Sequence, residues 1–180
     1  MAVEKNVPTT GTMEEVGSFN EQLMSFAGGK VYIGKGSYAD RATFAAAFAN
    51  LSAKEAELSA SFDELSDLAD APGKIGSSTE PLKSRHYIVD GKRTNTAELN
   101  LAGMSEARKA FIERDINKNE QTIILVDDDK PDKIMCLNGL RWSGSWEGEL
   151  DKVFNAKINT EFSGSTVNKI WFMEDIPAGV

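Results

Sequence analysis

Apolar and polar side chains alternate with a period of two over much of the chain from Arg85 to Asp175. The most regular stretch places Phe154, Ala156, Ile158, Thr160 and Phe162 on one parity and Lys157, Asn159 and Glu161 on the other. Successive side chains of a β-strand point to opposite faces, so this pattern favours strands with one buried face. Antiparallel sheets commonly have such strands. The sequence therefore predicts an antiparallel sheet scaffold in this half of the chain.

Further strands are expected on either side of turn signals. They are Lys30–Gly34, Arg85–Val89, Gln121–Val126, Lys133–Leu140 and Val167–Met173. Pro72-Gly73 indicates a turn, and Asp90-Gly91 is a hairpin dipeptide that tolerates positive φ. The last strand is apolar on both parities, which indicates burial on both faces.

Two segments show helical periodicity. Asp40–Asn50 carries Phe44 and Phe48 at helical spacing with Asp40 as N-cap, and Ser105–Asn117 has a single apolar stripe with Ser105 as cap. Ser52–Ala71 fits two interpretations. Its start matches a capping box, whereas Leu58, Ala60 and Phe62 alternate as a strand would. This segment stays open between helix and strand.

These elements predict a mainly β, α+β fold: an antiparallel β-sandwich or small barrel with one flanking helix and a helical insertion. Residues 1–29 are expected to be a flexible N-terminal arm, and residues 30–180 a single domain, because the chain shows no repeat and no low-complexity linker. Within the arm, Met1–Phe19 is polar and aperiodic. The apolar residues Phe19, Leu23, Met24 and Phe26 indicate a short docking segment.

Composition excludes several classes of protein. The formal net charge of -8 argues against a duplex-binding surface, which draws its affinity from clustered basic residues. A single cysteine, Cys136, cannot form an internal disulfide, so the fold does not depend on an oxidising compartment. The sequence has no apolar run long enough for a membrane-spanning helix and no secretory signal pattern. Synthesis in a cytoplasm is the expectation.

Two motifs resemble ligand-binding sites, but the residues around each of them argue against that function. Gly29–Lys35 satisfies most of a P-loop pattern, but its middle is a β-branched and aromatic strand and Gly36 replaces the magnesium-binding hydroxyl. Asp127-Asp128-Asp129 resembles a set of ligands for a hard cation, but consecutive residues point in different directions and Pro131 indicates a hairpin tip. The acidic residues Asp63, Glu64, Asp67 and Asp70 are interpreted in the same way, as solvated carboxylates.

The remaining candidates are single residues. His86 is the only histidine and cannot build a multi-histidine metal site, and Cys136 lies in the middle of a strand as a small hydrophobe. The spacing of Trp142, Trp146 and Phe154 fits a stacking platform for sugar or single-stranded nucleic acid and equally a core face. Because the acidic balance removes the electrostatic part of the nucleic-acid case, we predict that they form a core face. We therefore predict no catalytic, cofactor-binding or metal-ligating residue, no cofactor and no enzyme activity.

The order of elements resembles the tail tube proteins of long-tailed bacteriophages and contractile injection systems. The resemblance rests on the following segments in this order: Val31–Gly34, Leu65–Pro72, Thr94–Leu99, one helix, Ile123–Asp129, and a long alternating hairpin that ends at Val167–Phe172. The resemblance implies a virion protein of the tail that forms hexameric rings, which stack into a hollow tube for genome passage. It also implies an acidic lumen through which DNA slides without specific binding. Met1–Phe19 and Ser52–Ser84 would make ring-to-ring contacts, and neighbouring tail proteins would be partners.

Two alternatives to this hypothesis belong to other classes. A monomeric or dimeric β-sandwich binding or adhesion module would be favoured if Trp142 and Trp146 were both exposed to solvent. A metal-dependent enzyme using the acidic turns would bind a stoichiometric divalent metal and lose activity on Asp127→Asn/Asp128→Asn substitution.

Overall fold

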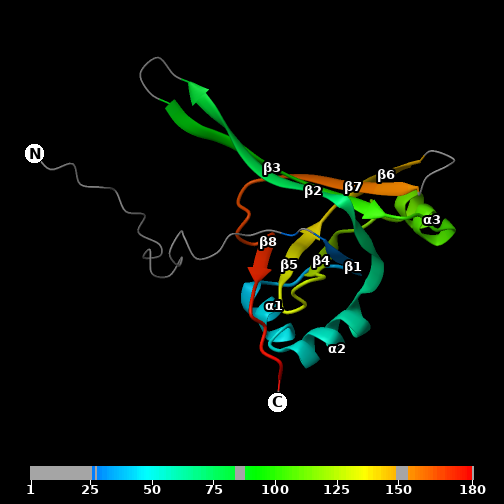
Figure 1. Cartoon of the computed structure of the whole chain (residues 1–180). Helices are drawn as coiled ribbons and strands as arrows, with labels where there is room; N and C mark the ends of the chain where they lie inside the picture. The colour runs from blue at the N-terminus through cyan, green and yellow to red at the C-terminus, as the bar shows by residue number, and fades with distance from the viewer. Residues whose placement is uncertain (1–25, 27, 84–87, 149–153, 180) are drawn as a thin grey trace, which may run out of the picture.

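The structure is a computed structural model that describes residues 26, 28–83, 88–148 and 154–179. Its eight strands form one sheet in the order β6-β7-β3-β2-β1-β4-β5-β8, in which every neighbouring pair is antiparallel (Figure 1). The strands are β1 Gly29–Lys35, β2 Asp63–Lys83, β3 Ile88–Ala102, β4 Gln121–Asp127, β5 Ile134–Leu140, β6 Ser143–Glu147, β7 Asn155–Ser163 and β8 Ile170–Met173. The helices are α1 Arg41–Ala47, α2 Leu51–Ser61 and α3 Glu106–Arg114. The prediction of a mainly β, α+β fold is confirmed.

The long strand β2 belongs to both halves of the sheet and bends between them. Its first residues pair with β1 up to Asp67, and from Gly73 onward it pairs only with β3. At the bend, residues 69–72 lie opposite the single residue Asn100, whose side-chain amide donates a hydrogen bond to the carbonyl of Ala71 at 2.7 Å. Such a bulge sharpens the local twist, and β2 curves visibly in Figure 1. The open sheet thereby folds over itself as a sandwich does.

The bend replaces the turn that Pro72-Gly73 predicted, and that prediction is wrong. Gly73 adopts a φ of 122°, which side chains rarely tolerate, and an added Cβ would lie 2.0 Å from the carbonyl oxygen of Glu98. The glycine therefore allows β2 to approach β3 closely instead of reversing the chain. The predicted hairpin at Asp90-Gly91 is also wrong, because Asp90 pairs with Pro81 inside β3. The connection between β2 and β3 lies at 84–87, outside the described residues.

The main core fills the space between the two halves of the folded sheet. Ala97, Leu99 and Leu101 of β3 and Ala156 and Ile158 of β7 are at most 3% exposed, which confirms the alternation predicted for both strands. The same core receives Val31, Ile33, Leu65, Leu68, Ile112, Ile116, Ile123, Leu125, Leu137, Leu140 and Trp142. Burial of this much apolar surface is the dominant favourable term in folding.

A second core lies on the other side of β4 and β5, under helices α1 and α2. Phe44 of α1 and Phe48, the C-cap residue of that helix, are fully buried there. The ring centroids of Phe44 and Trp171 lie 5.4 Å apart. Ile176, in the segment that follows β8, completes this packing. Strand β4 is therefore covered on both faces, and all of its residues are buried.

This arrangement corrects the prediction for Val167–Met173. The strand β8 begins only at Ile170, Val167 is 71% exposed, and Trp171 is the buried member of the strand. Two-sided burial belongs to β4 instead, because β4 lies in the middle of its half of the sheet whereas β8 lies at the edge.

The helix ends follow the capping residues. Asp40 accepts a hydrogen bond from the backbone N–H of Thr43 at 2.7 Å, and Ser105 caps α3 as predicted. The segment Ser52–Ala71, left open between helix and strand, is helical up to Ser61 and extended from Asp63. The strand interpretation of Leu58 and Ala60 is therefore wrong, because both lie in α2. The N-cap of α2 is Asn50 and not Ser52, the residue that the capping-box pattern indicated. Helix α1 lies within the predicted helical segment Asp40–Asn50 and ends at Ala47. None of the described helices is long and apolar enough to cross a membrane.

Substitution of Gly73 should test the bend. Gly73→Ala is expected to lower the free energy of unfolding by about 2 kcal/mol. Alanine disfavours the φ of this position, and its Cβ would clash with the carbonyl oxygen of Glu98 so that the backbone of β3 has to shift. Gly76→Ala is the matched control, since an added Cβ there meets its nearest atom at 3.7 Å, and it should change stability by less than about 0.5 kcal/mol. Urea denaturation monitored by circular dichroism measures both. Equal effects would contradict the role given to Gly73.

Candidate interaction surfaces

The P-loop-like stretch Gly29–Lys35 coincides with β1. Its residues pair with β4 along the whole strand and with β2 over Lys30–Ile33. A phosphate-binding loop needs free backbone N–H groups that converge on the ligand, and paired strand residues do not supply them. This stretch is therefore structural.

Asp127 ends β4 and organises the tight turn that precedes β5. Its carboxylate accepts hydrogen bonds from the backbone N–H groups of Asp129 and Lys130, at 3.0 and 3.2 Å, and lies 3.4 Å from the ammonium of Lys133. Asp128 and Asp129 are exposed. The three aspartates thus have separate environments at a turn, as predicted, but Asp127 is buried and not solvated because it bonds the turn backbone and pairs with Lys133.

The other predicted acidic stretch runs along β2. Glu64 forms an ion pair with Lys30 of β1 at 3.2 Å, and both side chains are nearly half exposed. The hydrogen bond and charge of Glu64 raise the pKa of Lys30. Within the described ranges, no group of three His, Cys, Asp or Glu side chains lies close enough to hold a metal ion.

The remaining candidates from the sequence lie apart from one another. Cys136 is fully buried in the second core, and burial raises the pKa of its thiol, which disfavours the reactive thiolate. Trp142 is buried, as predicted for a core face. The same prediction is wrong for Trp146, which is 37% exposed and has Phe154 at a ring-centroid distance of 6.0 Å. Trp146 also packs on α3, where Lys109 lies over its ring and Glu113 accepts its indole N–H. His86 lies outside the described residues. A stacking platform that uses both tryptophans is therefore not formed.

Sequence reasoning missed the long hairpin made by β2 and β3. Strand β3 pairs with β7 only from Thr94 onward, and β2 pairs with β1 only up to Asp67. Residues 79–83 and 88–93, here named the extended hairpin, thus form a two-stranded ribbon that has no third strand in the described part of the chain. Figure 1 shows it projecting well beyond the rest of the molecule. The β2 residues between Ile75 and Glu80, which lead into the hairpin, are mostly small, polar and exposed.

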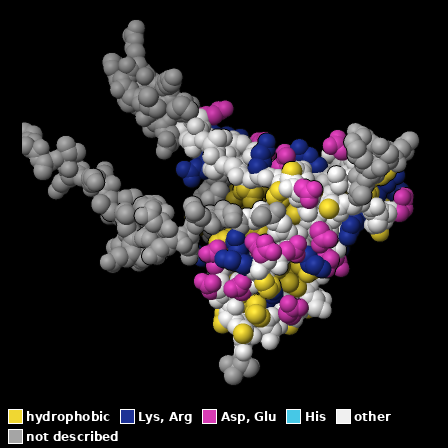
Figure 2. Space-filling view, viewed as in Figure 1, with side chains coloured by type: hydrophobic (Ala, Val, Ile, Leu, Met, Phe, Trp, Pro, Cys, Tyr) yellow, Lys and Arg dark blue, Asp and Glu magenta, His cyan; other side chains and the backbone are white. Residues whose placement is uncertain are grey.

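The sheet also leaves two edge strands of different character. Strand β6 ends one side of the sheet and β8 ends the other. Almost every residue of β6 is exposed, whereas β8 is short and apolar. Open edges present unpaired N–H and C=O groups on which another chain can pair. On the face shown in Figure 2, acidic and basic side chains are interspersed and do not segregate into one strongly charged patch.

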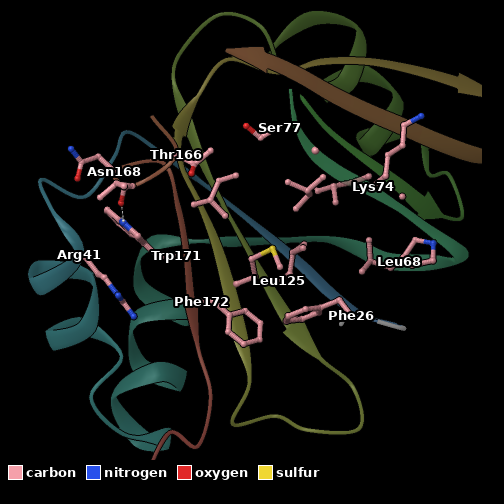
Figure 3. Close-up of a pocket in the computed structure, with 18 residues that line it drawn as sticks. Phe26, Arg41, Leu68, Lys74, Ser77, Leu125, Thr166, Asn168, Trp171 and Phe172 are labelled. Atoms are coloured by element: carbon pink, nitrogen blue, oxygen red, sulfur yellow. Dashed lines mark hydrogen bonds between the residues drawn. The ribbon is translucent and has the colours of Figure 1, made fainter. Parts of the chain in front are cut away.

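An apolar groove of about 870 Å³ opens between the base of the extended hairpin and the β5–β8 side of the sheet (Figure 3). Gly73–Ser77 of β2 form one side, and Met135, Ile170 and Phe172 lie on the other. We name it the interlayer groove, because it continues the space that the main core fills deeper in the molecule. Phe26 lies in its lining beside Phe172.

No protein-family model matches the chain, and no curated protein matches it. Among solved structures, one chain of the "Virion of native gene transfer agent (GTA) particle" is similar at 13% sequence identity, with a TM-score of 0.38. The match covers 62% of this chain and 88% of that chain. A TM-score this low does not establish a shared fold.

Removal of the Asp127 carboxylate should distinguish a structural turn from a metal site. Asp127→Ala is expected to lower the free energy of unfolding by about 3 kcal/mol, because it takes a carboxylate away from the largely buried ammonium of Lys133. Asp128→Ala is the control and should cost less than about 0.5 kcal/mol, as is usual for an exposed position. Thermal unfolding with and without millimolar Mg²⁺ or Ca²⁺ provides the measurement. A midpoint that rises with added metal and no longer does so in Asp128→Ala would support the metal site instead.

Proposed function

We propose that this chain is a structural virion protein that assembles with copies of itself into stacked hexameric rings, which form the hollow tail tube for genome passage. The proposal extends the resemblance in the order of sequence elements. The observation that supports it best is the extended hairpin, a two-stranded ribbon that projects beyond the body of the molecule.

A ribbon of this kind gains little stability by itself. An isolated two-stranded hairpin is marginally stable in water, and three or more strands or a packed face are needed for independent stability. Among the hairpin side chains that the structure describes, Thr79, Glu80, Lys92 and Arg93 offer no apolar face that could pack on the body. Pairing with strands of another copy would satisfy the two outer edges of the hairpin and order it.

The two edges of the sheet favour contacts of the heterologous kind. Strand β6 is polar and exposed, and β8 is apolar and short, so the edges are not self-complementary. Contacts between unlike surfaces produce a closed ring when the rotation closes and a helical filament when it does not. Rings that stack through the hairpins would use both kinds of surface in one assembly.

The charge of the chain suits a conduit for DNA. Its net charge of -8 disfavours retention of a polyanion, because affinity for DNA arises mainly from cations that neutralise phosphates. An acidic lumen would therefore let DNA pass without specific binding. The arm Met1–Phe19 and the hairpin part of Ser52–Ser84 would make the ring-to-ring contacts, since the rest of that range is the helix α2 and the body of β2.

Negative-stain electron microscopy of the concentrated protein tests the proposal. Rings or tubes of uniform bore are the expected result, and monomers that persist under varied salt and concentration would overturn it.

Two truncations locate the contacts. A chain without Met1–Phe19, and a chain whose hairpin is shortened by joining Thr79 to Arg93 through Asn-Gly, should keep the circular dichroism spectrum of the full chain but lose stacking. The join preserves the register, because Thr79 and Arg93 are paired in the intact hairpin. The full-length chain at the same concentration is the control. Normal tubes from either variant would remove the corresponding segment from the ring-to-ring contact.

A further inference from the structure

The interlayer groove has an apolar floor and a basic rim. Leu99, Leu125, Met135 and Ile170 line it from four different strands. Arg41 and Lys74 also lie in its lining, both exposed, and none of the described residues that line it is acidic. Such a composition is unusual on a chain with an excess of carboxylates, and it favours an occupant that is apolar and acidic.

Phe26 fixes where the chain enters this groove. Its ring packs edge-to-face on Phe172, with centroids 6.1 Å apart, and the ammonium of Lys133 lies 5.0 Å from its centroid. The same ammonium is held by Asp127. Residues that precede Phe26 in the sequence therefore start at the lining of the groove, and each of them can extend the chain by at most ~3.6 Å.

The preceding sequence has the composition that the groove favours. Phe19, Leu23 and Met24 are apolar, and Glu14, Glu15 and Glu21 are acidic. From Asn6 to Gly29 the sequence contains no Lys or Arg. Apolar side chains would cover the partly exposed members of the apolar floor, Met135 and Ile170. The carboxylates would lie close to Arg41 and Lys74 at the rim.

We propose that residues 19–24 of the same chain dock into the interlayer groove. Leu23 and Met24 contact its apolar lining, and Glu21 faces the basic rim. The docking is intramolecular because the tether at Phe26 gives the segment an effective concentration in the millimolar range, as short flexible links do. The inference does not depend on assembly into a tube, since it concerns the isolated subunit.

Paramagnetic relaxation measurements on the monomeric subunit test this docking directly. A nitroxide is attached to Asn20→Cys in the full chain, where Cys136 stays unlabelled because it is fully buried. Methyl resonances of Leu99, Met135 and Ile170 should broaden strongly, and that of Ile112 on α3 should broaden much less. Equal broadening at all four, or none, would overturn the proposal.

A mixing experiment separates the same copy from a second copy. Spin-labelled protein without isotopes is mixed with isotope-labelled protein without the spin label, and no broadening is expected in the mixture. Broadening of the groove methyl resonances there would show that the segment docks on a second copy, which would overturn the intramolecular proposal.

Substitutions test separately the apolar contacts of the docked segment and its attraction to the basic rim. Phe19→Ser/Leu23→Ser/Met24→Ser should raise the fluorescence of the hydrophobic dye ANS several-fold, because it uncovers the apolar floor. Val3→Ser/Val7→Ser is the matched control and should leave the fluorescence unchanged. Arg41→Glu/Lys74→Glu, at two exposed positions, should weaken the relaxation effect on the groove methyl groups. Dye binding that is the same in the triple variant and its control would contradict the docking, whatever the microscopy of tubes shows.

Discussion

The bend in β2 is the constraint on which the rest of the structure depends. A strand that pairs with β1 at its start and only with β3 after Gly73 forces one continuous sheet into two facing layers. The main core exists because those layers face each other, and the extended hairpin exists because β2 and β3 continue beyond the body. The interlayer groove opens beside the same bend. Gly73 makes this possible through a backbone conformation and a close approach that a side chain would prevent.

Local patterns in the sequence predicted the elements whose environment is uniform along their length. The alternation of β7 reports one buried and one exposed face, and the caps Asp40 and Ser105 lie where the helices begin. The two turns predicted from dipeptides are absent for a physical reason. Pro72-Gly73 and Asp90-Gly91 are compatible with a bulge and with a paired ribbon as well as with a turn, and long-range pairing with the partner strand decided between them. The prediction that Val167–Met173 is buried on both faces was wrong for a similar reason. Only the strand order shows that β4 is central and that β8 is at the edge.

The candidate surfaces were less predictable than the fold. Each motif that suggested chemistry has a local structural explanation, such as the Asx turn of Asp127 or the paired backbone of β1. The groove, by contrast, joins residues from Phe26 to Phe172, and a single sequence does not indicate that they meet. One residue gave a modest indication of the groove in the sequence. Ile75 is an isolated apolar residue in a polar stretch, and it is exposed at the groove.

The extended hairpin and the interlayer groove are not independent surfaces. Gly73–Ser77 form one side of the groove and also lead into the hairpin, so a shift of the hairpin base changes the width of the groove. A contact that orders the hairpin in an assembly therefore acts on whatever occupies the groove, and the occupant acts on the hairpin by the same free energy. Burial of the floor by residues 19–24 would thus favour one position of the hairpin base over others. In a protein that assembles through its strand edges, such a link would connect the state of the N-terminal segment to the geometry of the ring contacts.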